Sequence, residues 1–245
     1  MSTNKATAKK AVWNESIADY LRDDLQFLQV YKDFVSIPWK NNHLSDKVKA
    51  LLLVALSASP THLSETAARS NIKRALEAGA TEQEISEILK IVSILGVHAC
   101  AVGIPLAMAQ FADSKPDEVE YNAEQLARKN RFVNTMGYWN EFRDYLLQKD
   151  EAYFDAYFEF LTVPIRRGIL EPKLVEFVYI AIDASTTHLF AKGIDVHMTN
   201  AKKYGATEGE ILEVIQLASA QGFDTLLHMY PILKEEVSNY TKFKG

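Results

Sequence analysis

The sequence predicts an all-α protein built as a tandem duplication of one helical unit. Residues 57–85 read SASPTHLSETAARSNIKRALEAGATEQEI, and 126 positions later residues 183–211 read DASTTHLFAKGIDVHMTNAKKYGATEGEI. Each copy contains an amphipathic segment that opens with a Thr–x–x–Glu capping box. A glycine of the kind that ends helices stands two residues before each box.

The same offset aligns the two copies along their length. It pairs Trp13 with Trp139 near the start and Pro105 with Pro231 near the end, without a gap. Repetition of this extent divides a chain into structural units. We therefore predict four segments, which are a disordered arm at 1–11, a first repeat at 12–112, a linker with a candidate helix at 113–137, and a second repeat at 138–245.

The first two helices of each copy follow from apolar runs. We expect the first over about 13–37, ending at Pro38, because proline cannot continue a helix without losing a hydrogen bond. The second covers about 45–58. Its counterpart Phe177–Ile182 resembles a strand when taken alone, but the first copy reads LLLVALSA, which favours a helix and decides both cases.

The third and fourth helices are bounded by a glycine and a threonine. The third ends at Gly79 in the first copy and at Gly205 in the second. The fourth begins at Thr81, with Glu84 three positions on, and the second copy repeats this spacing. In such a box the threonine accepts from a first-turn amide and the glutamate reaches back, so we interpret these glutamates as caps rather than catalysts.

Composition narrows the function classes. The formal charge of −5 argues against a nucleic-acid partner, which needs clustered Lys and Arg. The single cysteine, Cys100, excludes an intrachain disulfide and a CxxC pair, which fits a cytoplasmic location. The start of the chain lacks the apolar core of a signal peptide. The apolar stretch 91–112 is interpreted as a core or subunit-interface segment rather than a membrane span.

The duplication offers an internal control for candidate site residues. Glu176, Asp183 and His197 in the second copy stand where the first copy has Ala50, Ser57 and Asn71. Glu176 and Asp183 lie two turns apart on one helix face, and His197 follows on the next helix. Two carboxylates and an imidazole in a partly buried cleft can shift one another's pKa toward neutrality, as general acid–base catalysis requires. The alternative is structural: a surface glutamate, a helix-end aspartate and an interface histidine.

Further polar residues give weaker signals. Thr187 and His188 recur as Thr61 and His62 in the first copy, either as buried helix-start residues or as residues that line a pocket. His98 and the remaining histidines have no second ligand at metal spacing, so no metal and no other cofactor is predicted. No Gly-rich phosphate loop, serine nucleophile elbow or dinucleotide fingerprint is present.

The stretch HMTNAKKYGATEGEILEVIQLASAQGF resembles the carboxymuconolactone decarboxylase family, which includes the alkylhydroperoxidase-D-like proteins. The hallmark of the family is a histidine that opens a helix, followed by a glycine turn, a threonine with an acidic residue, and a helix that ends near a glycine. In this sequence these residues are His197, Gly205, Thr207, Glu210 and Gly222. The first copy has the related form IKRALEAGATEQEISEILKIVSILGV. The resemblance implies an alkylhydroperoxidase-D-like all-helical fold and a homo-oligomer, as a trimer or dimer of duplicated chains.

Two activities are associated with the family. One is peroxide reduction by a CxxC pair with an upstream glutamate and a downstream histidine. This sequence has Phe190 and Gly193 where those cysteines would stand, so the resemblance does not extend to a thiol peroxidase. The other activity is decarboxylation of a lactone acid by acid–base residues. His197 matches the family histidine directly, whereas Glu176 matches the upstream glutamate only if about two extra residues are allowed.

Two hypotheses remain open from the sequence. The first is a cofactor-independent enzyme, lyase-like or isomerase-like, acting on a small carboxylated or lactone-like metabolite. His197 would be the general acid or base and Glu176 would orient it, while Thr187 and His188 would line the pocket. The sequence marks no arginine to stabilise a developing enolate. The second hypothesis is a non-catalytic oligomeric binding or scaffold protein, in which Glu176 and His197 would not converge on a concave site.

Overall fold

A computed structural model describes residues 21–111 and 119–244, and the predicted arm at 1–11 lies outside the described residues. Within the described ranges every regular element is helical, which confirms the all-α prediction. The first repeat contains α3 (Leu25–Asn41), α4 (Asp46–Ala58), α5 (Glu65–Glu77), α6 (Glu82–Ser93), the 3₁₀ turn η1 (Ile94–Val97) and α7 (His98–Phe111). The second contains α10 (Glu151–Arg167), α11 (Pro172–Asp183), α12 (Ala191–Lys203), α13 (Glu208–Ser219), η2 (Ala220–Phe223) and α14 (Asp224–Lys244).

Two further helices precede α10. The predicted signals at the end of the third helix and the start of the fourth are present in both repeats. α8 (Ala123–Met136) lies in the segment predicted as a linker, and α9 (Phe142–Lys149) follows it. Both capping boxes are present, at Thr81 and at Thr207. The glycines that precede them have positive φ angles of 86° and 78°, which suit glycine because it carries no Cβ. The run that resembled a strand is part of α11.

The prediction of one helix over 13–37 that ends at Pro38 was wrong within its described part. The Asp24 side chain accepts from the amide of Phe27 at 2.9 Å, so α3 begins at Leu25. Pro38 lies inside the last turn of α3, which ends at Asn41. The second repeat has the same arrangement around Pro164 in α10. A proline inside a helix removes one hydrogen bond without always ending the helix, and α14 (Asp224–Lys244) also continues past its internal Pro231.

The core of the molecule is formed by α4 and α11, which pack against each other. Buried apolar residues of α4, α6, α11 and α13 make one continuous cluster around them. The Thr61 and Thr187 hydroxyls, which occupy equivalent positions 126 residues apart, hydrogen-bond to each other at 2.9 Å. The two repeats therefore meet face to face in a pseudo-twofold arrangement, and burial of apolar surface between them is the main stabilising contribution.

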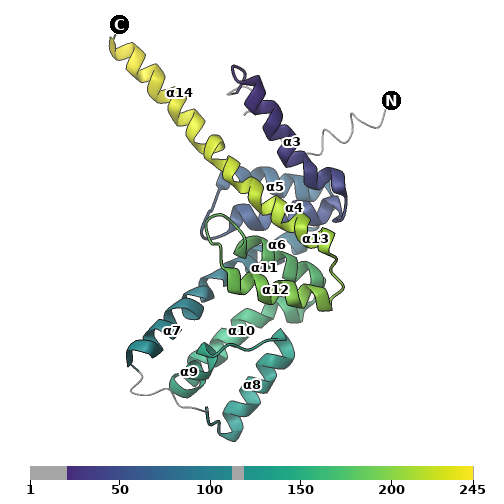
Figure 1. Cartoon of the computed structure of the whole chain (residues 1–245), viewed down its shortest axis with the longest axis vertical. Coiled ribbons are helices and arrows are strands. Elements are labelled where there is room, and N and C mark those ends of the chain that lie inside the picture. Colours follow the sequence, from purple (N-terminus) through teal and green to yellow (C-terminus); the bar gives the residue numbers. More distant parts are fainter. Residues whose placement is uncertain (1–20, 112–118, 245) are drawn as a thin grey trace.

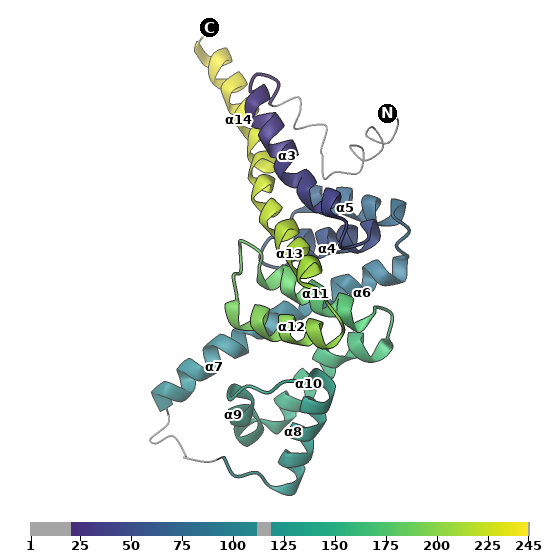
Figure 2. The same ribbon diagram turned by 45° about the vertical axis from the view of Figure 1, so that its right-hand side comes forward.

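The last helix of each repeat packs against the other half of the molecule, α7 against α9 and α14 against α3. α7 extends from the body on the side of α8, α9 and α10, whereas α14 extends in the other direction beside α3 (Figures 1 and 2). Ile94 of η1 belongs to a second apolar cluster with residues of α8, α9 and α10, and Leu28 of α3 packs against Leu227 of α14. This exchange places the start of α7, from the first repeat, next to residues of the second repeat.

Within the described residues, one helical segment is long and apolar enough to cross a membrane, and α7 forms its second half. That segment runs from Glu82 to Phe111, and an 18-residue stretch within it has a mean hydropathy of 2.1. Its first half, α6, contributes buried residues to the core, as expected from the sequence. Its second half, α7, has no buried residue in the isolated chain.

Candidate active site

A buried histidine–carboxylate pair joins α11 and α12. His197 Nδ1 lies 2.7 Å from Glu176 Oε2, and the two residues are 6% and 8% exposed. The other carboxylate oxygen, Oε1, accepts from Asn200 Nδ2 at 3.3 Å. A carboxylate at Nδ1 favours the tautomer that carries its proton there, which leaves Nε2 as the atom able to accept or donate a proton. Sequence comparison of the repeats predicted both members of this pair.

Two tyrosines surround the imidazole of His197. The Tyr179 ring stacks on it with centroids 4.4 Å apart, and Tyr138 approaches edge-on at 6.3 Å. Burial raises the pKa of both phenols well above the ordinary value, so both hydroxyls keep their protons at neutral pH. The Tyr179 hydroxyl has no hydrogen-bond partner within the described ranges. The site therefore offers neutral hydroxyl donors beside the imidazole.

These residues border a cavity of about 550 Å³, which is the size range of small-molecule sites. The lining comes from η1, α7, α9, α10, α11 and α12, together with the end of α8 and the segment between α8 and α9. It includes His98, Tyr138, Arg143, Tyr157, Tyr179 and His197. The first repeat thus contributes η1 and α7 to the wall of a cavity that is otherwise formed by α8 and by the second repeat.

Arg143 on α9 is the buried cation of this cavity, and the sequence analysis missed it. It is 3% exposed, and its Nη2 donates to the Tyr157 hydroxyl at 2.7 Å. The guanidinium lies over the ring of Phe132 at 4.4 Å, and Asn140, with its amide oxygen turned toward Arg143, accepts from Nη1 at 3.2 Å. Nε has no hydrogen-bond partner, and no carboxylate pairs with Arg143 in the described part of the chain.

A signal for Arg143 was present in the repeat comparison. Position 143 corresponds to Ile17 in the first copy. An ionisable residue is therefore present only in the second copy, as it is at Glu176, Asp183 and His197. Buried arginines are almost always paired with an anion. An unpaired one on a cavity wall is therefore a candidate anion-binding group.

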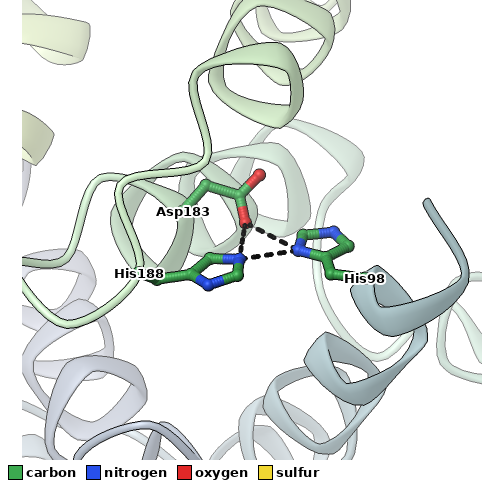
Figure 3. Close-up of side chains that lie close together, drawn as sticks. All are labelled: His98, Asp183 and His188. Atoms are coloured by element: carbon green, nitrogen blue, oxygen red, sulfur yellow. Dashed lines mark hydrogen bonds and ion pairs between the residues drawn. The ribbon is translucent and has the colours of Figure 1, made fainter. Parts of the chain in front are cut away.

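A second polar cluster lies at the end of α11 and contains Asp183, His188 and His98 (Figure 3). His98 Nδ1 and His188 Nε2 are 2.7 Å apart. Asp183 Oδ1 lies 3.6 Å from that His98 atom and 3.8 Å from that His188 atom. Asp183 is fully buried, and neither carboxylate oxygen has a hydrogen-bond partner among the residues described. The structure thus brings together two histidines that are 90 positions apart.

Burial controls the protonation of this cluster. It raises the pKa of the Asp183 carboxyl to about 8. Burial, together with the nearby charges of His188, His197 and Arg143, lowers the pKa of His98 to about 4, and burial lowers the pKa of His188 as well. Both imidazoles are therefore neutral at neutral pH, and their contacts with Asp183 are not ion pairs in that state.

Space for the Asp183 side chain depends on the glycine at position 193. A Cβ built on Gly193 would lie 2.0 Å from Asp183 Oδ2 and 2.6 Å from Phe190 Cδ1. The first repeat has Ala67 here, facing the smaller Ser57. The positions where redox relatives would carry cysteines, Phe190 and Gly193, thus pack around Asp183.

The residues predicted for the site fall into three places. Glu176 and His197 converge at the cavity. Asp183 lies on the same helix as Glu176 but contacts His98 and His188 instead. Thr187 hydrogen-bonds to Thr61 at the junction of the repeats and is not part of the cavity wall.

Comparison with known proteins adds three findings. The model of the carboxymuconolactone decarboxylase family matches residues 26–111 and again residues 151–235. A crystal structure from Burkholderia xenovorans LB400, provisionally described as a gamma-carboxymuconolactone decarboxylase subunit, is similar with a TM-score of 0.87 and 32% sequence identity. The similarity covers 96% of this chain and 98% of that chain. No curated protein matches the chain.

Proposed function

This chain belongs to the carboxymuconolactone decarboxylase family, and on that premise we propose that it is an enzyme of the lyase or isomerase type. Its substrate is a small metabolite that carries a carboxylate or a lactone, and its reaction is acid–base chemistry at His197. The observation that supports this most is the buried His197–Glu176 pair, with its 2.7 Å contact, on a cavity of about 550 Å³.

The proton-transfer role follows from how His197 is held. Glu176 accepts a hydrogen bond from His197 Nδ1, and Asn200 donates a hydrogen bond to the other carboxylate oxygen of Glu176. A positioned imidazole of this kind contributes roughly 10²- to 10⁴-fold to a rate when it transfers a proton in the transition state. In a decarboxylation, the C–C bond to the carboxylate breaks, its electron pair stays on the substrate as an enolate, and His197 supplies the proton that forms the new C–H bond.

Arg143 is the proposed anion-binding group. Its guanidinium has no carboxylate partner in the described part of the chain, and it borders the same cavity as His197. A planar guanidinium can bind a carboxylate through two parallel hydrogen bonds, or stabilise the oxygen of a developing enolate. It therefore fills the role for which the sequence marked no residue.

The test is a thermal-shift screen of the full chain against five-membered lactones that carry a carboxylate and against short dicarboxylates. A ligand at about a hundred times its dissociation constant adds roughly 2.7 kcal/mol to the free energy of unfolding. We expect the shift to disappear in Arg143→Met and to persist in His197→Asn, while turnover disappears in His197→Asn. A shift that persists in Arg143→Met, or turnover that persists in His197→Asn, contradicts the proposal.

We also propose that the chain forms a homo-oligomer, as a trimer or a dimer of duplicated chains. The large exposed apolar residues of α7 and α14 are Val102, Leu106, Phe111, Met229, Ile232, Leu233, Val237, Tyr240 and Phe243. Apolar faces of this extent mark interaction sites, and the similar Burkholderia protein is described as a subunit. Light scattering coupled to size-exclusion chromatography would give the mass directly. A monomer would contradict the proposal.

The second candidate function is the non-catalytic binding or scaffold protein, which the exposed apolar residues of α7 and α14 also support. A non-catalytic binding or scaffold protein would form the oligomer but would turn over no member of the panel. Turnover that is lost in His197→Asn would therefore exclude it.

A further inference from the structure

The cluster of His98, His188 and Asp183 has no role in the proton transfer described above. Its three facing atoms are His98 Nδ1, His188 Nε2 and Asp183 Oδ1, and they lie within 4.8 Å of one another. We propose that these three atoms bind one divalent first-row transition-metal ion, with Zn²⁺ as the reference ion, at the wall of the cavity.

The distances fit such an ion. The three separations are 2.7, 3.6 and 3.8 Å and join the same three atoms. The circle through three points with these separations has a radius of about 2.0 Å, which matches the Zn–N and Zn–O bond lengths of roughly 2.0–2.2 Å. An ion at or just above the centre of this triangle therefore reaches all three ligands without movement of the backbone.

The chemistry of the donors fits as well. Two imidazoles and one carboxylate form the ligand set that zinc and non-haem iron(II) sites use, with positions left open for water or substrate. A metal binds the deprotonated imidazole nitrogen, and the facing atoms His98 Nδ1 and His188 Nε2 both point toward the Asp183 carboxylate. Asp183 is fully buried, and neither of its oxygens has a hydrogen-bond partner in the described ranges. A bound cation would satisfy a carboxylate that is otherwise costly to bury.

The surroundings hold these ligands in place. Gly193 provides the space that the Asp183 carboxylate occupies, because any Cβ there would overlap Oδ2. The Phe190 ring packs on the His98 ring with centroids 4.4 Å apart. His98 is the member of the three that lines the cavity, so the open positions of the ion would be reached from the same space as His197.

The first repeat provides an internal control. The residues equivalent to Asp183, His188 and His98 are Ser57, His62 and Asp224. His62 Nε2 and Asp224 Oδ2 pair directly at 2.6 Å, and the third position offers only a serine hydroxyl. This cluster has one imidazole where the other has two, and its carboxylate already has a partner. We therefore expect the second-repeat cluster alone to bind the ion.

The experiment is calorimetric titration of ZnSO₄ into the chelator-treated full chain, followed by titration of Co²⁺ with visible absorption as the readout. Neither measurement needs a substrate, so the result is independent of the proposed function. We expect one ion per chain. His98→Gln, His188→Gln and Asp183→Asn should each weaken binding by more than the ten- to hundredfold that loss of a supporting residue costs. His62→Gln should bind as wild type does.

Circular dichroism spectra verify that each variant folds. If Asp183→Asn does not fold, His98→Gln decides the question, because His98 is partly exposed at the start of α7. Wild-type binding no tighter than that of the His98→Gln/His188→Gln double variant would overturn the proposal. Equal loss of binding in His62→Gln would also overturn it. In either case the cluster would be a hydrogen-bonded group of polar side chains without an ion.

Discussion

The two repeats share a backbone arrangement but differ in the cavity beside their third helix. In the second repeat this cavity is about 550 Å³, whereas the equivalent space in the first, beside Asn71 and Ser57, is about 60 Å³. The first-repeat space is closed by Tyr31, whose ring stacks on Phe223 with centroids 3.4 Å apart. The equivalent of Phe223 is Val97, which leaves the second cavity open. Among the described residues, the two spaces therefore differ at Phe223 and its equivalent Val97.

The second repeat also has the ionisable side chains at the positions beside the cavity. The second repeat has an imidazole at His197 and a carboxylate at Glu176, where the first has Asn71 and Ala50. Asn71 instead donates to the carbonyl of Leu53 at 3.2 Å, which makes it a structural residue. The two copies thus place different chemical groups at equivalent positions of the same fold.

The largest expected effect comes from giving the second repeat the first-repeat residue at position 197. His197→Asn should lower kcat by roughly 10²- to 10⁴-fold on a lactone acid, because the general acid or base is lost. The reciprocal control, Asn71→His, should leave kcat unchanged, since Ala50 stands where the second repeat has Glu176 to hold the imidazole. Steady-state kinetics would measure both. Comparable losses from the two substitutions would contradict the division of roles between the repeats.

A smaller effect is expected at position 193. Gly193→Ala places a Cβ 2.0 Å from Asp183 Oδ2, and overpacking of this kind costs about 1–3 kcal/mol. Urea denaturation would measure the loss. Adding Asp183→Ser, which restores the first-repeat pair, should recover part of it, so the two changes should be non-additive. If the two losses in the free energy of unfolding were strictly additive, the space at Gly193 would not be required by the Asp183 side chain.

Closing the second cavity should weaken ligand binding. Val97→Phe introduces the residue that helps fill the first-repeat space, and we expect at least a tenfold rise in Kd, or about 1.4 kcal/mol. Phe223→Val is the matched control and should leave that Kd unchanged. Calorimetric titration with a lactone acid would show the difference. An unchanged Kd in Val97→Phe would mean that the ligand binds elsewhere.

The smallest effect is a pH dependence of stability in the chelator-treated chain. The pKa of Asp183 is raised by burial to about 8, so the folded state binds a proton that the unfolded state releases above about pH 4. Its contribution to stability is full below pH 4 and is lost as the pH rises to 8. His98, with its pKa lowered to about 4, acts in the opposite sense up to its ordinary value of 6.5.

The Asp183 contribution is therefore isolated between pH 6.5 and 8. Wild-type stability should fall there by up to about 1.4 kcal/mol per pH unit relative to Asp183→Asn. Urea denaturation at several pH values would measure this difference. Parallel curves for the two proteins would show that Asp183 does not titrate in that window.

The sequence predicted the fold well because helix signals are local and occurred twice. Capping boxes, positive-φ glycines and the ambiguous Phe177–Ile182 run could each be checked against the other copy. The Pro38 boundary was wrong, because a proline inside a helix removes one hydrogen bond without always ending the helix, and α14 likewise continues past Pro231. Asp24, whose side chain caps α3, was not recognised as the start signal.

The site was predictable only where the repeats could be compared directly. Glu176 and His197 were identified as residues found in one copy alone. Arg143 met the same criterion but was not weighed. The meeting of His98 with His188 depends on the exchange of α7 between the repeats, a tertiary feature that no local pattern contains.

The central claim, that only the second repeat holds a site, is tested most directly by the stoichiometry of binding. Calorimetric titration of the full chain with a five-membered lactone carboxylate should give one ligand per chain. Binding should be lost in Arg143→Met and kept in Asn71→Ala. Two ligands per chain, or no binding by the lactone acid at all, would contradict the account.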